Sequence, residues 1–523
     1  MQLIDLPDEI LLIIFRKLNK IELFCSLLGV HQRLDRVLHD SIFTNTLTLL
    51  EKFSPPDICS LSPLVLDRLC SQVLPAIEHK IQWMNLEGSS LERVLSSGNF
   101  LHLFGLGVYG ITKTYALHLL SDETLLCHQL RKQISSLAVQ TTGNVGYPFD
   151  LNELIFTNLI YTFSNLKSLD LNPFKVYHQI TTMSKAHLSV YSSTLRELSI
   201  QLRWIDDCLY ILDGRFDQLC VFNVKVMYSS RSRSLLDFDQ VKSSNLRSFS
   251  FTNLFEIDCY DEFLVPLLRR MLKLEELRLY MACSRRKSFV DGNDLKANVI
   301  EFFPRLKVFI FAIYSTIRDY DKMNLLTNED IQKTFLEFPT ENIVSCVDYF
   351  PNRNESQCYV YTLPFPLTSY ERIANNFQDG LFPSVRKVSL FDERPFEHQF
   401  FRRIQKSFPL LEELSVVNRQ AQNEKSKNAN DYLPLIYYKH LSSLDLLLVH
   451  DDYIEEFLLD TKTSLPFNIN VNVAYEAIHR VTDDFRRIET RMNCSKVNCL
   501  YSSFEISRPS KHFEGYFRST VSY

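Results

Sequence analysis

The stretch Leu166-Lys167-Ser168-Leu169-Asp170-Leu171 decides the fold, because its apolar pattern recurs along most of the chain. Apolar residues stand at positions i, i+3 and i+5, and the end of the pattern alternates as a short strand does. The later copies are Leu195/Leu198/Ile200, Leu219/Phe222/Val224, Leu246/Phe249/Phe251, Leu274/Leu277/Leu279, Leu306/Phe309/Phe311, Val385/Val388/Leu390, Leu411/Leu414/Val416 and Leu441/Leu444/Leu446. The earlier and weaker copies are Ile81/Met84/Leu86, Leu101/Phe104/Leu106 and Ile134/Leu137/Val139.

Aromatic residues and helix-length spacers accompany the pattern. An aromatic residue stands three positions before the copies that start at 166, 219, 306, 385, 411 and 441. These residues are Phe163, Phe216, Phe303, Phe382, Phe408 and Tyr438, and we expect them to pack beneath the coil. Stretches of helical length, such as 263–271 and 396–408, lie between the copies, which start about 20 to 33 residues apart. The chain is therefore predicted to consist of strand–helix units.

A unit of this size cannot bury its apolar face alone, so the units are predicted to stack into an α/β solenoid. Leu169, Leu171, Leu277 and Leu279 should point into the core. The intervening residues point to the opposite face, which we predict to face a protein substrate; they are Asp170, Ser199, Arg278, Ser389 and Ser415. The phase is lost in a divergent or inserted segment at about 312–381, although Tyr359-Val360-Tyr361 within it alternates like a strand.

The N-terminus carries a second pattern, from Leu6 to Leu18. Pro7 suits the first turn of a helix, and Asp8 and Glu9 suit the positive end of its dipole. The six residues from Ile10 to Phe15 are all apolar. A helix that is apolar all round is buried on several sides. Because so short a region cannot cover this helix alone, the pattern indicates a partner.

Two further helices are expected after the first one. Asn19 can cap a helix over residues 20–28 that Gly29 ends. A third helix over 31–39 would place Leu34, Val37 and Leu38 on one face.

The N-terminal stretch resembles an F-box, whose Leu-Pro-x-Glu-Ile-Leu opening matches residues 6–11 and whose Phe-x-x-Leu continuation matches residues 15–18. The remainder resembles a divergent leucine-rich repeat region. The resemblance implies an α/β fold with a three-helix F-box at 1–47 and an irregular leucine-rich-repeat-like solenoid, or horseshoe, at 48–523. It also implies docking on the Skp-type adaptor of a cullin–RING ubiquitin ligase through Leu6, Pro7, Ile10, Leu11, Phe15 and Leu18.

By this resemblance the protein is a non-catalytic substrate receptor that tethers an unknown protein for ubiquitination. Two departures from the pattern stand out. Leu34 and Leu38 occupy the region where many F-boxes carry a Trp, and the repeats lack a regular Asn after their third apolar position. The alternative is a ligase-independent interaction scaffold whose N-terminal helices cap the repeat array.

Composition narrows the class of protein further. The net charge of -5 gives no reason to expect nucleic acid, and the chain shows neither a signal peptide nor an apolar run that could span a membrane. Its 12 cysteines form no Cys-x-x-Cys pair, which predicts reduced thiols in the cytosol or nucleus and no zinc site. No cofactor and no homo-oligomer are expected.

Three other motifs have alternative interpretations. Gly105-Leu-Gly107-Val-Tyr-Gly110 matches a dinucleotide-binding pattern, but no βαβ frame surrounds it, so close backbone packing is the preferred interpretation. His450-Asp451-Asp452 with Glu455 and Glu456 could hold a cation or form a solvated face, and Arg231-Ser232-Arg233 could bind phosphate or form a surface loop. No sequence motif places a nucleophile beside a base, so no enzymatic activity is expected.

Overall fold

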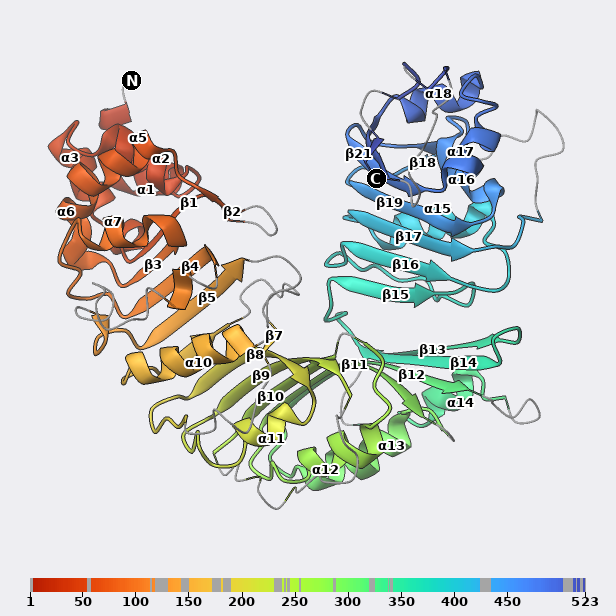
Figure 1. Ribbon diagram of the computed structural model, residues 1–523, viewed down its shortest axis with the longest axis horizontal. Helices are drawn as coiled ribbons and strands as arrows, with labels where there is room; N and C mark the ends of the chain where they lie inside the picture. The colour runs from red at the N-terminus through yellow and green to blue at the C-terminus, as the bar shows by residue number, and fades with distance from the viewer. Residues whose placement is uncertain are drawn as a thin grey trace. The chain divides into compact units, whose positions relative to one another are not determined.

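The structure of the protein is a computed structural model (Figure 1). It describes residues 3–53, 58–112, 115–117, 130–142, 150–171, 180–181, 190–229, 238, 241, 245–253, 255–285, 288–318, 325–336, 338, 342–423, 434–501, 511–513, 515–517 and 521–522. The chain forms two compact units. Unit 1 comprises residues 1–281 and 298–309, and unit 2 comprises residues 282–297 and 310–523.

Short helices open unit 1. The N-terminal helices are α1 (Asp8–Phe15), α2 (Lys20–Leu27), α3 (Gln32–Leu38) and α4 (Ser41–Thr44). The Asn19 side chain accepts hydrogen bonds from the N–H groups of Ile21 and Glu22, and Gly29 has φ +81°, which confirms the predicted start and end of the second helix. The later helices of unit 1 are α5 (Pro63–Arg68), α6 (Leu74–Ile77), α7 (Leu91–Leu95), α10 (Asp150–Thr162), α11 (Asp207–Ile211) and α12 (Val265–Leu268).

The sheet of unit 1 is largely parallel, and strands that follow one another in sequence are mostly neighbours. Its strands are β1 (Thr46–Phe53), β2 (Ile58–Ser60), β3 (Trp83–Glu87), β4 (Gly105–Thr112), β5 (Ser136–Thr142), β6 (Ser168–Asp170), β7 (Ile180–Thr181), β8 (Glu197–Trp204), β9 (Val221–Tyr228), β10 (Ser248–Asn253) and β11 (Glu276–Arg285), of which the last four residues belong to unit 2. Only β2 is antiparallel to its neighbour among these described strands.

Unit 2 contains a hairpin and a second sheet. The strands β12 (Val308–Arg318), β13 (Ile343–Phe350) and β14 (Glu355–Thr362) pair antiparallel, with β14 in the middle, and the first two residues of β12 belong to unit 1. The second sheet has the order β15 (Ser369–Ile373), β16 (Lys387–Phe391), β17 (Glu413–Asn418), β19 (Ser443–Val449), β21 (Ile469–Val473), β22 (Val497–Tyr501) and β23 (Val521–Ser522), all parallel.

Helices and two short strands complete unit 2. The helices are α13 (Gly292–Asn298), α14 (Asn328–Lys333), α15 (His398–Ser407), α16 (Asp451–Leu458), α17 (Tyr475–Val481) and α18 (Ile488–Cys494), and the strands β18 (Ile436–Tyr437) and β20 (Thr463–Ser464) form a separate pair. The predicted helical stretch at 396–408 is confirmed by α15.

The predicted mixed α/β class is confirmed, with a large sheet and many helices. The predicted alternation also holds, because Leu169, Leu171, Leu277 and Leu279 are buried while the residues between them are half-buried. The six aromatic residues expected beneath the coil, from Phe163 to Tyr438, are buried as well. The strand expected at Tyr359–Tyr361 lies in β14, and the loss of phase around it reflects the antiparallel hairpin.

One predicted copy of the repeat is wrong. Leu101 and Phe104 are 64% and 45% exposed, whereas Leu103, Leu106 and Val108 are buried. The true i, i+3, i+5 set therefore starts two residues later, because β4 begins at Gly105 and its inward positions are Leu106 and Val108.

Candidate functional site

The first helix is held in place by charged side chains of the third helix. The Arg33 guanidinium donates to Asp8 Oδ1 at 2.9 Å and to the backbone oxygens of Ile4 and Leu6 at 2.6 and 2.7 Å. Arg36 binds the other oxygen of Asp8 at 2.9 Å. The hydrogen bond from Arg33, together with the charges of both arginines, lowers the pKa of the Asp8 carboxyl. These contacts orient α1 from its N-terminus.

The apolar run on α1 divides into an inner and an outer set. Leu11 and Phe15 are 0% and 1% exposed, and Phe15 packs edge-on against Phe43 with ring centroids 6.4 Å apart. Ile10 and Ile13 are 42% and 57% exposed. Since these two residues lie one helical turn apart, they share one face of α1.

The remaining residues predicted to bind the adaptor lie before and after Ile10 and Ile13 in the sequence. Pro7 is exposed, Leu6 is half-buried, and Leu18 is 51% exposed just beyond the helix. Leu11 and Phe15 are buried, so they can contribute to adaptor binding only by holding α1 in place from the core. We call Ile10, Ile13 and Leu18 the α1 surface.

The third helix contributes no apolar residue to an outer surface at the positions quoted from the sequence. Leu34, Val37 and Leu38 are all buried. The region where many F-boxes carry a Trp is thus part of the inner packing of the N-terminal helices.

The residues predicted to face a substrate fall into two register rows, one in each unit. In unit 1, Asp170 lies opposite Ser199 on the next strand, and Arg278 occupies the same row three strands further along. In unit 2, Ser389 lies opposite Ser415. All five are half-buried on the face opposite the apolar core. The structure therefore brings together three of them in one unit and two in the other.

Other polar residues complete these rows and were missed by the sequence reasoning. Asn223 and Ser250 lie between Ser199 and Arg278, and Asn223 donates to Ser199 Oγ at 3.2 Å. Asp445 and Asn472 extend the row in unit 2. The sequence contained a signal for Asn223, Ser250 and Asp445, because each stands between two inward apolar positions of a recognised repeat. Asn472 stands between Val471 and Val473, beyond the last recognised copy.

The glycine-rich motif lies inside strand β4. A Cβ atom on Gly105 would come within 1.9 Å of the Trp83 ring, and one on Gly107 within 2.3 Å of Asn85 Oδ1. Trp83 and Asn85 are the register partners of these glycines on β3. The glycines thus make room for two side chains of the neighbouring strand, which agrees with the packing interpretation.

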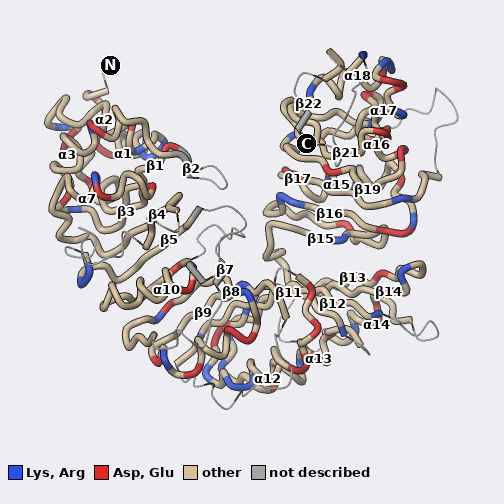
Figure 2. Tube along the Cα trace, in the orientation of Figure 1, with Lys and Arg blue, Asp and Glu red and all other residues tan. Residues whose placement is uncertain are grey.

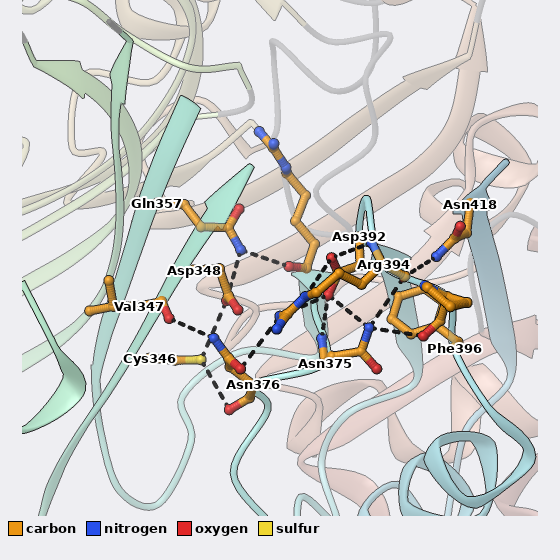
Figure 3. Close-up of polar contacts among 12 residues, drawn as sticks. Cys346, Val347, Asp348, Gln357, Asn375, Asn376, Asp392, Arg394, Phe396 and Asn418 are labelled. Atoms are coloured by element: carbon orange, nitrogen blue, oxygen red, sulfur yellow. Dashed lines mark hydrogen bonds and ion pairs between the residues drawn. The ribbon is translucent and has the colours of Figure 1, made fainter. Parts of the chain in front are cut away.

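A buried polar junction joins the β13–β14 hairpin to the second sheet of unit 2 (Figure 3). Asp348 is 2% exposed, and its Oδ2 accepts hydrogen bonds from Gln357 at 3.2 Å and Cys346 at 3.6 Å. Its Oδ1 has no hydrogen-bond partner within the described part of the chain. Burial raises the pKa of Asp348 to about 6, and the nearby Asp392 carboxylate adds to this shift.

The segments that follow β15 and β16 supply the other half of the junction. Asn376 donates to the backbone oxygen of Val347 at 3.2 Å, and Arg394 contacts Asn376 Oδ1 at 3.4 Å. Asp392 accepts hydrogen bonds from the backbone N–H groups of Asn375 and Arg394 at 2.8 and 2.9 Å. Figure 3 shows these groups converging between the two sheets.

The acidic cluster at 450–456 is distributed among separate ion pairs. Asp451 binds Arg480 at 2.8 Å and Glu455 binds Arg487 at 2.6 Å. Glu456 is fully buried and contacts His398 Nδ1 at 2.6 Å. Across the described residues, no group of three or more His, Cys, Asp or Glu could hold a metal ion. The Arg231–Arg233 motif lies outside the described residues.

His398 and Glu456 are residue types that can act as an acid–base pair, but their contacts hold parts of the fold together. Burial lowers the pKa of His398, yet the hydrogen bond and the charge of Glu456 outweigh that effect and raise it overall. The second ring nitrogen of His398 contacts the backbone oxygen of Pro434 at 2.9 Å. Both nitrogens are therefore engaged in tying α15 to α16 and to the coil before β18.

No family model and no curated protein matches the chain. One solved structure, described as the crystal structure of the Rad7 and Elc1 complex in yeast, is similar over 82% of this chain and 92% of that chain. The sequence identity is 14% and the TM-score 0.27, which is too low for any conclusion about this protein. None of the described helices has the length and apolar character needed to cross a membrane.

Proposed function

We propose that the chain is the substrate-recognition subunit of a Skp–cullin–F-box ubiquitin ligase. The N-terminal helices would be its F-box, and the repeated strands and helices would be an irregular leucine-rich-repeat-like solenoid. The observation that carries the proposal is the α1 surface, because Ile10, Ile13 and Leu18 are each at least 42% exposed. Exposed apolar residues gathered on a short helix and just beyond its end are typical of a protein-interaction site.

The mechanism is positioning and not chemistry. The α1 surface would dock on a Skp-type adaptor, while the polar rows on the strands would hold a target protein. Tethering raises the effective concentration of the target at the ubiquitin-transferring subunits. These partners would place the protein in the cytosol or the nucleus.

The proposal is tested by co-purification of a purified Skp-type adaptor with the full chain. Ile10→Glu and Ile13→Glu should each reduce adaptor recovery at least tenfold, because a carboxylate on the docking face would be desolvated. The matched control is Leu272→Glu, which places the same charge on a residue that is 63% exposed outside the α1 surface. Adaptor binding that is absent in the wild type, or unchanged in both variants, would refute the proposal.

The second candidate is a ligase-independent interaction scaffold. The half-buried polar rows support this function as well as the ligase function, because they could bind a partner without an adaptor. Affinity purification of the wild type beside the Ile13→Glu variant distinguishes the two functions. A scaffold would keep its full set of partners in the variant, whereas a ligase receptor would lose the adaptor and the cullin together.

A further inference from the structure

The residues that immediately precede strands β6 and β8 to β12 form a continuous ladder of backbone hydrogen bonds. The N–H of Arg196 donates to Lys167 O at 2.7 Å, and the N–H of Cys220 donates to Arg196 O at 2.8 Å. The ladder continues at 2.8 Å per step through Arg247, Glu275 and Lys307. We call these six residues the turn row. Because each belongs to a different strand connection, the row crosses the strands with a spacing of about 4.8 Å.

The turn row carries an excess of positive charge. Four of its members are Lys or Arg, one is Glu, and all four basic residues are exposed. Arg247 and Lys307 have side chains that are 68% and 73% exposed. Across the described residues, no acidic side chain pairs with Lys167 or Arg196.

The single acid of the turn row is outnumbered by the bases around it. Glu275 binds Lys307 at 2.7 Å and Arg247 at 3.5 Å. The hydrogen bond from Lys307 lowers the pKa of Glu275, and the charges of Lys307, Arg247 and Arg305 lower it further. One carboxylate thus faces three cations.

The nearest acids of the following register row are already engaged. Glu197 accepts a hydrogen bond from Ser168 at 3.1 Å, and Glu276 forms an ion pair with Arg278 and accepts from Ser248 at 2.9 Å. The contact with Arg278 offsets the charge of Glu276, whereas Glu197 keeps its negative charge because its partner Ser168 is neutral. With Glu197 and Glu275 set against the four bases, the turn row retains an excess of positive charge.

The equivalent row in unit 2 provides an internal comparison. There the N–H of Arg386 donates to Thr368 O and the N–H of Glu412 donates to Arg386 O, each at 2.7 Å. Arg386 and Glu412 also form an ion pair at 3.4 Å, so that row is neutral. Acidic and basic segments are interspersed over the other described residues (Figure 2), and the net charge of the whole chain is -5. The basic row is thus a local feature.

We propose that the turn row is a docking surface for an acidic, extended segment of a partner protein, bound through carboxylate or phosphate groups. Charge complementarity selects this occupant. Arginine and lysine pair with both kinds of anion through charge-assisted hydrogen bonds. A single line of cations on an acidic protein suits a short anionic segment better than a polyanion, which the remaining surface repels.

The test is fluorescence anisotropy of the full chain with three labelled probes. These are a peptide of alternating Glu and Gly, the same peptide with phosphoserine in place of Glu, and single-stranded DNA of equal charge. Both peptides should bind saturably at low salt, and binding should weaken at least about tenfold at physiological ionic strength, since exposed charges are screened. The two peptides distinguish carboxylate from phosphate as the preferred group.

Charge reversal of the turn row provides the decisive comparison. The variant carrying Lys167→Glu, Arg196→Glu, Arg247→Glu and Lys307→Glu should lose at least tenfold in peptide affinity, whereas Arg386→Glu in the neutral row should lose none. The corresponding four substitutions to Gln keep the test valid if the reversed chain does not fold. Absence of peptide binding, affinity retained in the Gln variant, or tighter binding of DNA through the same residues would overturn the inference.

That the acidic segment belongs to a protein captured for ubiquitination rests on the proposed function, whereas the binding itself does not. The Ile13→Glu variant separates the two. It should bind both peptides as the wild type does, so failure of adaptor docking leaves this measurement unaffected.

Discussion

Strands β8 to β11 and the β13–β14 hairpin are held to their neighbours by different means. In the first region, Leu198, Phe222, Phe249 and Leu277 are register partners on successive parallel strands, and all have an exposed fraction of 0%. The hairpin buries polar side chains beside apolar ones, because Asp348, Ser356 and Gln357 are as buried as Phe350 and Val360.

The outer edge of the hairpin shows the same difference. The backbone N–H of Val347 on β13 donates to Asn328 Oδ1 at 2.6 Å, and Gln332 of α14 donates to the backbone oxygen of Ile343 at 3.1 Å. Side chains here form the hydrogen bonds to backbone N–H and C=O groups that a neighbouring strand forms in β8 to β11. A region stabilised by apolar burial should respond to cavities, and one stabilised by buried polar contacts should respond to pH.

The largest expected effect is that of a cavity in the regular strands. Leu277→Ala should lower the free energy of unfolding by about 2–5 kcal/mol, because the side chain is fully buried and its neighbours cannot collapse into the space. Urea unfolding followed by tryptophan fluorescence measures the loss. Leu277→Ile is the control and should cost less than about 1.5 kcal/mol, since it conserves volume. Equal losses for the two variants would show that packing at this position is loose.

A second variant probes close packing between strands β3 and β4. Gly105→Ala should cost about 1–3 kcal/mol, because its new methyl group would overlap the Trp83 ring. The loss is measured by the same urea titration. Replacing the ring with a smaller side chain in Trp83→Leu should remove most of this overlap. The double variant should therefore lose less free energy of unfolding than the two single variants lose in sum. Strict additivity would mean that Trp83 is not the obstacle.

The hairpin should instead show a pH-dependent stability that Asp348→Asn removes. The folded pKa of Asp348, about 6, lies above its ordinary value of 3.8. The folded state therefore binds this proton more tightly than the unfolded state, and the resulting stability is complete below about pH 4 and is lost as the pH rises through 6. Above pH 7 the Asn variant should be more stable than the wild type by about 1–3 kcal/mol.

Thermal unfolding between pH 4 and 8 measures this difference. The groups facing Asp348 are Gln357, Cys346, Asp392 and Arg394. Asp379→Asn is the matched control, because the Asp379 carboxylate is 75% exposed and forms its ion pair with Arg403 at the surface. A parallel pH profile for wild type and Asp348→Asn would show that Asp348 does not titrate in this range.

The smallest effect is expected on the outer face of the regular strands. Arg278→Glu should change the free energy of unfolding by less than about 0.5 kcal/mol, because Arg278 is half-buried opposite the core and its ion pair with Glu276 lies at the surface. A loss as large as that of Leu277→Ala would mean that both faces of β11 are buried.

The sequence by itself determined the α/β class, most of the strands, and the face on which each strand residue lies. It could do so because inward positions of a strand recur every second residue and the repeat supplies many copies, so that Leu169 and Leu277 identify the core independently. It also predicted the Asn19 cap and the role of Gly29, since both depend on local backbone geometry. The error at Leu101 and Phe104 arose because two overlapping sets of apolar residues have the same spacing. Both Leu101/Phe104/Leu106 and Leu103/Leu106/Val108 fit the i, i+3, i+5 pattern, and only the second set is buried.

Only the tertiary structure decided which apolar residues of α1 face outward. Ile10, Leu11, Ile13 and Phe15 have the same chemical character, and their division into an inner and an outer set depends on where α3 and Phe43 pack. The turn row was likewise invisible in sequence, because strand pairing brings together residues from successive repeats. The same holds for the Asp348 junction, where the hairpin segment 346–357 meets residues 375–394 of the second sheet. Local rules act over a few residues along the chain, whereas charge clusters, burial and docking surfaces depend on distances through space.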